Sequence, residues 1–173
     1  MSNASSTQTI FPQVYVTLRK LAERRLRHDR SRQSLTPSDL VHEVYLRLLR
    51  DGSGAWESPS HFYFVAAEAI RRILVERARR RLAMRHGGGL TRVPFDEQVE
   101  GIGPAEEMVA LDQGLDRLER HYPRKAQVVK LRYFAGFSVE ETSSLLDVSP
   151  GTVKHDWTFA RAWLRRTLRH EPD

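Results

Sequence analysis

The chain has 173 residues, of which 28 are Lys or Arg and 22 are Asp or Glu, so its formal net charge is +6. It contains no Cys, which excludes a disulfide scaffold, a thiolate nucleophile and a Cys-type zinc site. No apolar run reaches the roughly 18 residues that a membrane helix needs, and the polar N-terminus lacks the pattern of a signal peptide. We therefore expect a soluble intracellular protein of one or two small domains, without membrane insertion.

The charge is distributed unevenly along the chain. Residues 1–86 carry a net charge of +8, residues 87–107 carry −4 and residues 108–173 carry +2. This pattern predicts two basic modules separated by an acidic spacer. Arg accounts for 24 of the basic residues, and its planar guanidinium suits phosphate contacts, but a GC-rich coding bias would give the same excess.

Two helices are predicted in the first fifty residues. Apolar residues at three- and four-residue spacing indicate an amphipathic helix over residues 12–28, with Pro12 at its start. Thr36 followed by Pro37 is a start signal for a second helix, and the glycines of residues 51–54 end it.

The outer face of this second helix carries three charged residues at successive four-residue steps, namely Asp39, Glu43 and Arg47. By itself this spacing is equally typical of a solvated face with ion pairs along one helix. The pattern alone therefore assigns no function to the face.

A third, longer helix is predicted from Ser58-Pro59 to the glycines at residues 87–89. Aromatic residues precede and open it, and residues 71–92 hold eight Arg. Unpaired bases stack on aromatic rings, at about 1–3 kcal/mol per base, while Arg neutralises phosphate. Phe62 and Phe64 are interpreted as core residues. The candidates for binding opened DNA are Trp56, His61, Tyr63, Arg71, Arg72, Arg79 and Arg80.

The remaining chain predicts a linker and further helices. Residues 87–104 hold five Gly and two Pro without helical periodicity, which is typical of a linker. Apolar spacing indicates one helix beyond Pro104 and another over roughly residues 124–135. We therefore expect an all-α fold of two small helical bundles joined by a flexible linker. The expected units are residues 10–86, 87–104 and 105–170.

The C-terminal bundle contains the pattern of a helix-turn-helix. Gly136 can end the preceding helix, and residues 138–141 (Ser-Val-Glu-Glu) form a capping box that starts a short helix. Asp147-Val148 supplies the turn, and Asp tolerates the left-handed conformation that Gly often provides there. Ser149-Pro150 then starts a second helix, which is predicted to enter the major groove of DNA.

The outer face of that second helix carries the candidate DNA contacts. They are Thr152, Lys154, His155, Thr158 and Arg161. Lys154 and Arg161 are expected to contact phosphates, which gives affinity without sequence choice, while the other three are better placed for base edges. Asp156 could accept a hydrogen bond from a cytosine amine or lie in solvent, and we expect it to lie in solvent.

Together these segments resemble the extracytoplasmic-function (ECF) group of bacterial sigma factors, the promoter-recognition subunits of RNA polymerase. Residues 35–48 are similar to the helix that docks on the polymerase clamp. Residues 62–81 are similar to the helix that melts and reads the minus-10 element. Residues 134–154 are similar to the domain that reads the minus-35 element, and residues 157–166 resemble one ECF subgroup. The resemblance covers about residues 10–168.

The resemblance implies a cytoplasmic protein without catalytic residues, cofactor or metal. Its implied partners are core RNA polymerase, through the clamp and the flap, promoter DNA and an anti-sigma factor. It also implies capture of a flipped minus-10 base near the loop at residues 52–61. This chain departs from the common family pattern at residues 67–70, where Glu68 introduces an acid. The implied polymerase-docking residues are Asp39, Leu40, Glu43 and Arg47.

Two other classes of protein are alternatives to this interpretation. A free-standing helix-turn-helix transcriptional regulator would use residues 1–86 as an effector or dimerisation domain. A nucleic-acid enzyme would need clustered carboxylates or an activated Ser, and the seven His residues show no paired zinc spacing. The first alternative stays open at this point, whereas nothing meets the requirements of the second.

Overall fold

The computed structural model describes residues 4–27, 35–50, 56–84 and 105–169, and all regular structure within these ranges is helical. The elements are α1 (Ala4–Leu26), α2 (Pro37–Arg50), α3 (Pro59–Met84), α4 (Ala105–His121), α5 (Pro123–Val129), the π-helical segment η1 (Lys130–Phe134), α6 (Val139–Leu146) and α7 (Pro150–Arg169). The predicted all-α fold is confirmed. The predicted linker, residues 87–104, lies outside the described ranges. None of the helices in those ranges combines the length and apolar character needed to cross a membrane.

Local capping groups start α2 and α3 where the sequence predicts. The hydroxyl oxygen of Thr36 accepts a hydrogen bond from the backbone N–H of Asp39 at 3.1 Å, and the Asp39 carboxylate accepts from the N–H of Thr36 at 3.1 Å. The hydroxyl of Ser58 accepts from the N–H of His61 at 3.1 Å in the same way. In both helices a Pro occupies the first position, where a missing N–H costs nothing.

The predicted start of the first helix is wrong. α1 begins at Ala4, so that Pro12 lies inside the helix and not at its first turn. A Pro removes one backbone donor and bends the axis, but a helix can continue through it, so a Pro does not by itself set a boundary.

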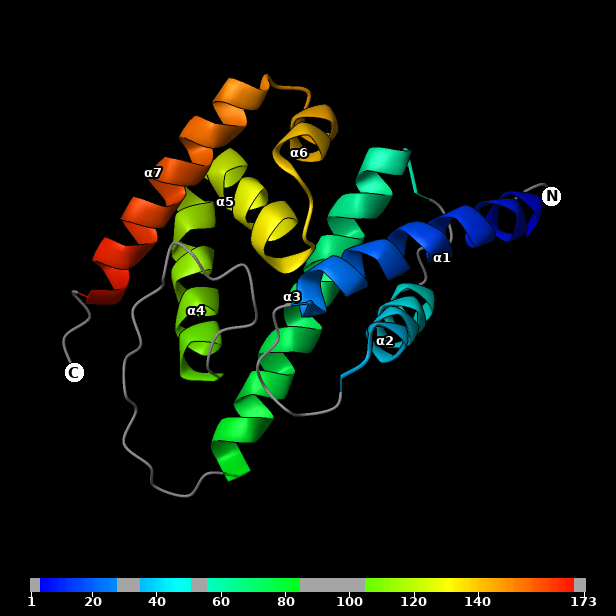
Figure 1. Cartoon of the computed structure of the whole chain (residues 1–173), viewed down its shortest axis with the longest axis horizontal. Coiled ribbons are helices and arrows are strands. Elements are labelled where there is room, and N and C mark those ends of the chain that lie inside the picture. The colour runs from blue at the N-terminus through cyan, green and yellow to red at the C-terminus, as the bar shows by residue number, and fades with distance from the viewer. Residues whose placement is uncertain (1–3, 28–34, 51–55, 85–104, 170–173) are drawn as a thin grey trace.

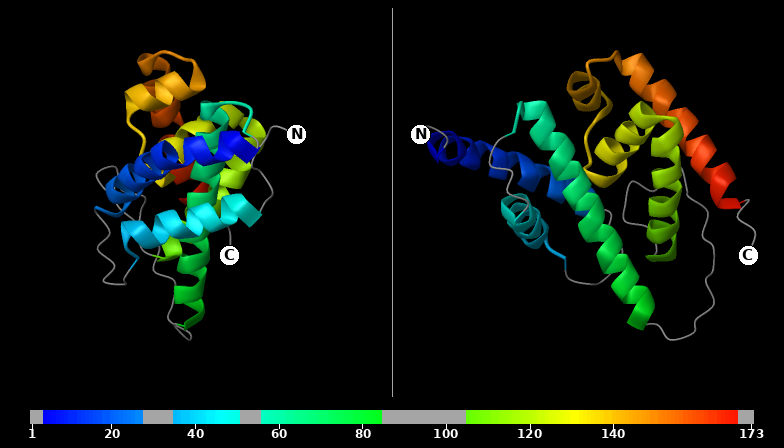
Figure 2. Two further views of the ribbon diagram at one scale, coloured as in Figure 1. Left: turned by 90° about the vertical axis from the view of Figure 1, so that its right-hand side faces the viewer. Right: turned by 180° about the vertical axis from the view of Figure 1, so that it is seen from behind.

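Helix α3 lies in the middle of the molecule. Helices α1 and α2 cover one side of it, and the elements from α4 onward lie on the other side (Figures 1 and 2). We call α1–α3 the front lobe and α4–α7, with η1, the rear lobe. Because α3 packs against α2 of its own lobe and against α4 and η1 of the rear lobe, it buries residues around most of its circumference, as a central helix must.

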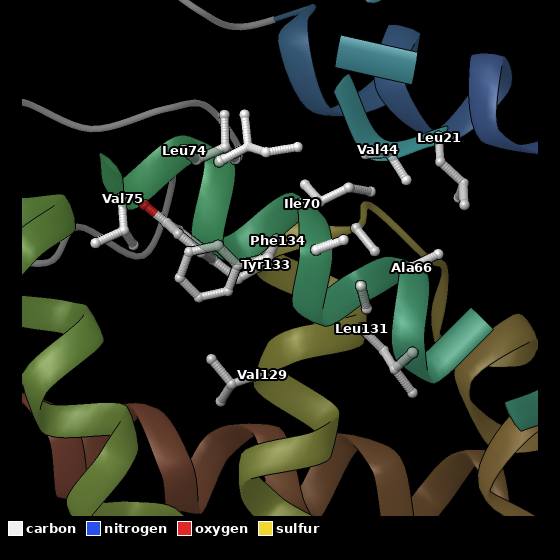
Figure 3. Close-up of a cluster of buried hydrophobic side chains, with 14 of the residues drawn as sticks. Leu21, Val44, Ala66, Ile70, Leu74, Val75, Val129, Leu131, Tyr133 and Phe134 are labelled. Carbon is white, nitrogen blue, oxygen red and sulfur yellow. The ribbon is translucent and has the colours of Figure 1, made fainter. Parts of the chain in front are cut away.

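The two lobes share one hydrophobic cluster. Leu21 of α1 and Val44 of α2 lie on one side of Ile70 of α3, and Leu131 and Phe134 of η1 lie on the other (Figure 3). All five side chains are at most 2% exposed. The expected two helical bundles are therefore packed against each other along α3.

The rear lobe is built on α4. Its predicted apolar residues are fully buried, and Gly114 allows α7 to approach closely. A Cβ at Gly114 would lie 3.1 Å from the Cδ2 atom of Leu164. The helix predicted over residues 124–135 is α-helical only to Val129 and then widens into η1.

Candidate nucleic-acid interface

The segment from α6 to α7 has the local geometry that its capping residues predict. The Ser138 hydroxyl accepts from the N–H of Glu141 at 3.1 Å, and the Glu141 carboxylate accepts from the N–H of Ser138 at 2.7 Å, so the capping box is confirmed. Asp147 ends α6 in the left-handed region, with φ 53° and ψ 48°. The Ser149 hydroxyl then accepts from the N–H of Thr152 at 3.1 Å and starts α7. These local bonds fix the angle at which α7 leaves the turn.

Helix α7 presents a polar face on a rigid support. Val153, Ala160 and Leu164 are fully buried against the rear lobe. Of the predicted DNA contacts, three are exposed and two are half-buried. Lys154, His155 and Thr158 are the exposed ones, and Thr152 and Arg161 are the half-buried ones. Lys154, His155 and Thr158 therefore lie on the open side of α7, whereas the Arg161 guanidinium lies over the Trp157 ring.

The expectation that Asp156 lies in solvent is wrong. Its side chain is fully buried, and its carboxylate accepts hydrogen bonds from Arg124 Nε at 2.6 Å and Lys125 Nζ at 2.9 Å. Burial raises the pKa of Asp156, but the hydrogen bonds from Arg124 and Lys125 lower it by a larger amount. The pKa of Asp156 therefore lies below its ordinary value. Asp156 thus anchors α7 to α5 and is not a base-reading group.

The aromatic residues at the start of α3 form a chain that reaches the rear lobe. The Trp56 and Phe62 rings lie edge to face with centroids 4.7 Å apart, and Tyr63 contacts Phe62 at 5.4 Å. On its other side Tyr63 contacts Phe137, which precedes α6, at 5.6 Å. Phe62 is buried, as predicted, while Trp56, His61, Tyr63 and Phe64 are half-buried. One of the rings predicted to stack on bases, that of Tyr63, therefore contacts the rear lobe.

Two of the predicted phosphate-binding residues of α3 are engaged by α4. Arg71 is buried, with only 4% of its surface exposed. Its guanidinium lies 2.7 Å from Asp112 and 2.6 Å from Asp116. Arg79 donates to the second Asp112 oxygen at 3.0 Å. Burial lowers the pKa of Arg71, but the hydrogen bond to Asp116 and the charges of Asp112 and Glu68 raise it above its ordinary value.

The other two predicted arginines of α3 face solvent. The side chains of Arg72 and Arg80 are 63% and 70% exposed. Each has an acid one turn earlier on α3, with Glu68 3.3 Å from Arg72 and Glu76 3.9 Å from Arg80. Exposed pairs of this kind contribute about 0.3–0.5 kcal/mol, so they hold the two arginines only weakly.

The predicted docking residues of α2 have different environments. Asp39 is exposed, and hydrogen bonds from Thr36 hold the pKa of its carboxyl below the usual range. Glu43 and Arg47 form ion pairs with Arg77 and Glu76 of α3. Leu40 is fully buried in the core, so it cannot itself form part of a surface.

Sequence reasoning missed the polar contacts between the lobes. Arg24 of α1 donates to both oxygens of Glu141, at 3.0 and 2.8 Å. Lys130 of η1 lies 3.2 Å from Glu68 of α3, so this acid has a cation of the rear lobe as a partner. The four-residue spacing of Asp112 and Asp116 does mark one face of α4, but nothing local in the sequence identifies the arginines that this face meets.

Within the described ranges, no three His, Asp or Glu side chains converge in a way that would hold a metal ion. The family model described as ECF sigma factor matches residues 2–170, which is almost the whole chain. A comparison with curated proteins gives no match.

Proposed function

Because this chain belongs to the ECF sigma factor family, whose role is in transcription initiation, we propose that it binds core RNA polymerase and selects promoters through minus-35 and minus-10 elements. The observation that carries this proposal is the exposed polar face of α7, which stands on a buried apolar stripe directly after a capped turn. A polar helix held in this way has the form that reads a major groove.

In the proposed complex α7 reads the minus-35 duplex. Lys154 and Arg161 neutralise phosphates, and Thr152, His155 and Thr158 meet base edges near the N-terminal end of the helix. The exposure of Lys154 and His155 supports these contacts, since both side chains can reach DNA without rearrangement of the rear lobe.

The front lobe holds the opened minus-10 strands. The Trp56 and Tyr63 rings both contact Phe62 near the start of α3, and His61 lies in the first turn of that helix. These three residues supply stacking surfaces for unpaired bases. Four arginines further along α3 supply the charge for the displaced phosphates, namely Arg71, Arg72, Arg79 and Arg80. Helix α2 docks on the clamp through Asp39, Glu43 and Arg47, while Leu40 holds α2 in place from the core. The rear lobe contacts the flap.

Run-off transcription with purified core polymerase and a library of genomic fragments tests the proposal. We expect specific transcripts only when polymerase and this protein are both present. Tight binding of a palindromic site by the protein alone, without any transcript, would favour the free-standing regulator instead.

Two neighbouring residues of α7 provide a matched pair of variants. Lys154→Ala should weaken binding to all sequences alike and flatten the salt dependence, because a lost phosphate contact carries no sequence information. His155→Ala should change the preference among minus-35 sequences. Identical behaviour of both variants would contradict the assigned roles.

The docking role of α2 is tested by Asp39→Ala combined with Glu43→Ala. We expect loss of polymerase binding in a co-purification assay while the helical circular dichroism is retained. Glu57→Ala, an exposed acid outside α2, is the control.

A further inference from the structure

The second residue of α5, Arg124, has a side chain that is 52% exposed and is held against the reading helix α7. Its Nε donates to Asp156 Oδ2 at 2.6 Å, and its Nη2 donates to Asp156 Oδ1 at 3.2 Å. Both donors belong to one edge of the planar guanidinium, whose N–H groups form a fixed fork. The N–H groups of the other edge are therefore directed away from Asp156.

The same carboxylate places Arg124 next to a predicted base contact. Nδ1 of His155 lies 3.8 Å from Asp156 Oδ1, the oxygen that also accepts from Arg124 Nη2. The His155 side chain is 77% exposed on the open side of α7. The guanidinium and the imidazole ring therefore meet at one oxygen atom beside the base-reading face. In a major-groove complex, the groups that flank this face lie closest to the phosphates that border the groove.

The cluster around Asp156 keeps a positive charge in spite of this acid. Arg124 and Lys125 both bind the single carboxylate, Lys125 through Nζ at 2.9 Å. The Lys125 side chain is only 16% exposed, and its Nζ lies over the Phe159 ring at 4.9 Å from the centroid. Because Lys125 is enclosed in this way, Arg124 is the member of the pair that presents its charge to solvent.

Arg124 and Lys154 lie on different sides of the reading helix. Lys154 is exposed, and Asp156, which holds Arg124, is two positions further along α7. Residues two positions apart point about 200° away from each other around an α-helix. A helix in the major groove has a phosphate strand on each side, so each of these cations faces a different strand in such a complex.

We propose that Arg124 is a phosphate contact of the minus-35 duplex, on the strand opposite to the one that Lys154 contacts. This inference rests on the proposed function. The Asp156 carboxylate fixes the guanidinium before DNA is bound, so that less side-chain freedom is lost on binding. A phosphate contact of this kind strengthens binding to every sequence alike and gives no base preference.

Arg124→Gln removes the charge and leaves an amide that can still donate to Asp156. The matched control is Lys125→Gln, which removes the other cation from the same carboxylate at an enclosed position. Each variant leaves one cation on Asp156, so we expect both to fold, and circular dichroism and the melting temperature check this. Arg124→Lys restores a positive charge at the exposed position.

Fluorescence anisotropy of a labelled DNA duplex of mixed sequence measures binding by the full chain at several salt concentrations. We expect Arg124→Gln to weaken binding about tenfold at low salt and to reduce the steepness of log K against log salt concentration by about one, as loss of one phosphate contact requires. Lys125→Gln and Arg124→Lys should keep the salt dependence of the unmodified protein. Arg124→Gln combined with Lys154→Ala should reduce the steepness by about two, because the two contacts involve different phosphates.

An unchanged salt dependence in Arg124→Gln would overturn the contact, and so would an equal reduction in Lys125→Gln. A reduction of only about one in the double variant would overturn the assignment to opposite strands. Run-off transcription by the unmodified protein with core polymerase tests the proposed function separately. If transcripts appear while Arg124→Gln keeps its salt dependence, only the contact is wrong. If the salt dependence changes as expected but no transcript appears, the phosphate contact stands and the proposed function is wrong.

Discussion

Helices α3 and α7 are both predicted to contact DNA, but they occupy opposite environments. Helix α7 packs against the other helices of the rear lobe along one apolar stripe and leaves its polar face open. Helix α3 is surrounded by both lobes, and one of its predicted DNA-binding arginines is buried. The difference shows that a polar residue on a helix is available to a ligand only if no other element covers that side.

Helix α3 is covered because the two lobes share a hydrophobic core, and Phe134→Ala tests that core. Phe134 is fully buried in the cluster that joins η1 to α3. The substitution should destabilise the protein by about 4 kcal/mol, because a large buried ring is lost and a cavity is left. Urea unfolding should show one transition for both lobes in the unmodified protein. Met84→Ala, at an 81% exposed position, should change stability little. Separate transitions of the two lobes would show that the core is not shared.

Helix α3 is also held against α4 by the ion pairs of Arg71. Arg71→Ala leaves the carboxylate of Asp112, which is 13% exposed, without its closest cation. Removal of one partner of a buried pair should cost about 3 kcal/mol in thermal or urea unfolding. Arg72→Ala, one residue along α3, should cost less than about 0.5 kcal/mol because its side chain faces solvent. Equal losses in the two variants would argue against a buried Arg71.

The exposed state of α7 depends on the short helix before it. Ser138→Ala removes the hydroxyl that caps α6 and should cost about 1 kcal/mol. Ser144→Ala is the control, since the Ser144 hydroxyl only donates to a carbonyl within α6. We expect weaker duplex binding from Ser138→Ala near its melting temperature. No change in stability would mean that the capping box does not hold α6.

The smallest expected effect is that of acid on the contacts between the lobes. The pKa values of Glu68 and Glu141 are lowered in the folded state. Burial raises the pKa of each carboxyl, but the charges of Lys130 and Arg71 lower that of Glu68 by more. Hydrogen bonds from Ser138 and Arg24 likewise lower the pKa of Glu141 by more than burial raises it. The stability they contribute is therefore complete above their unfolded pKa of about 4.3 and is lost as the pH falls through the folded pKa. Each partly exposed pair contributes about 0.5 kcal/mol. The melting temperature should therefore decrease below about pH 4, with a smaller decrease in Glu141→Gln.

Features that depend on neighbouring residues could be predicted from the sequence. The starts of α2 and α3, the capping box of α6 and the left-handed Asp147 each involve groups within four residues, and each was found where it was predicted. The apolar spacing of α4 and α7 likewise identified their buried sides.

Features that depend on distant residues could not be predicted. Arg71 meets Asp112 across 41 positions, and Asp156 meets Arg124 across 32. A charged residue at a helical position looks the same in the sequence whether solvent or an opposite charge lies beside it. The burial of these two side chains follows only from how the helices pack.

The Glu141 carboxylate has two simultaneous partners, the N–H of Ser138 in its own turn and the guanidinium of Arg24 in the front lobe. Loss of Arg24 removes only the second of these partners, so the first turn of α6 keeps its cap whether or not the front lobe contacts it. The local fold of α6 and its contact with the front lobe therefore respond to separate substitutions.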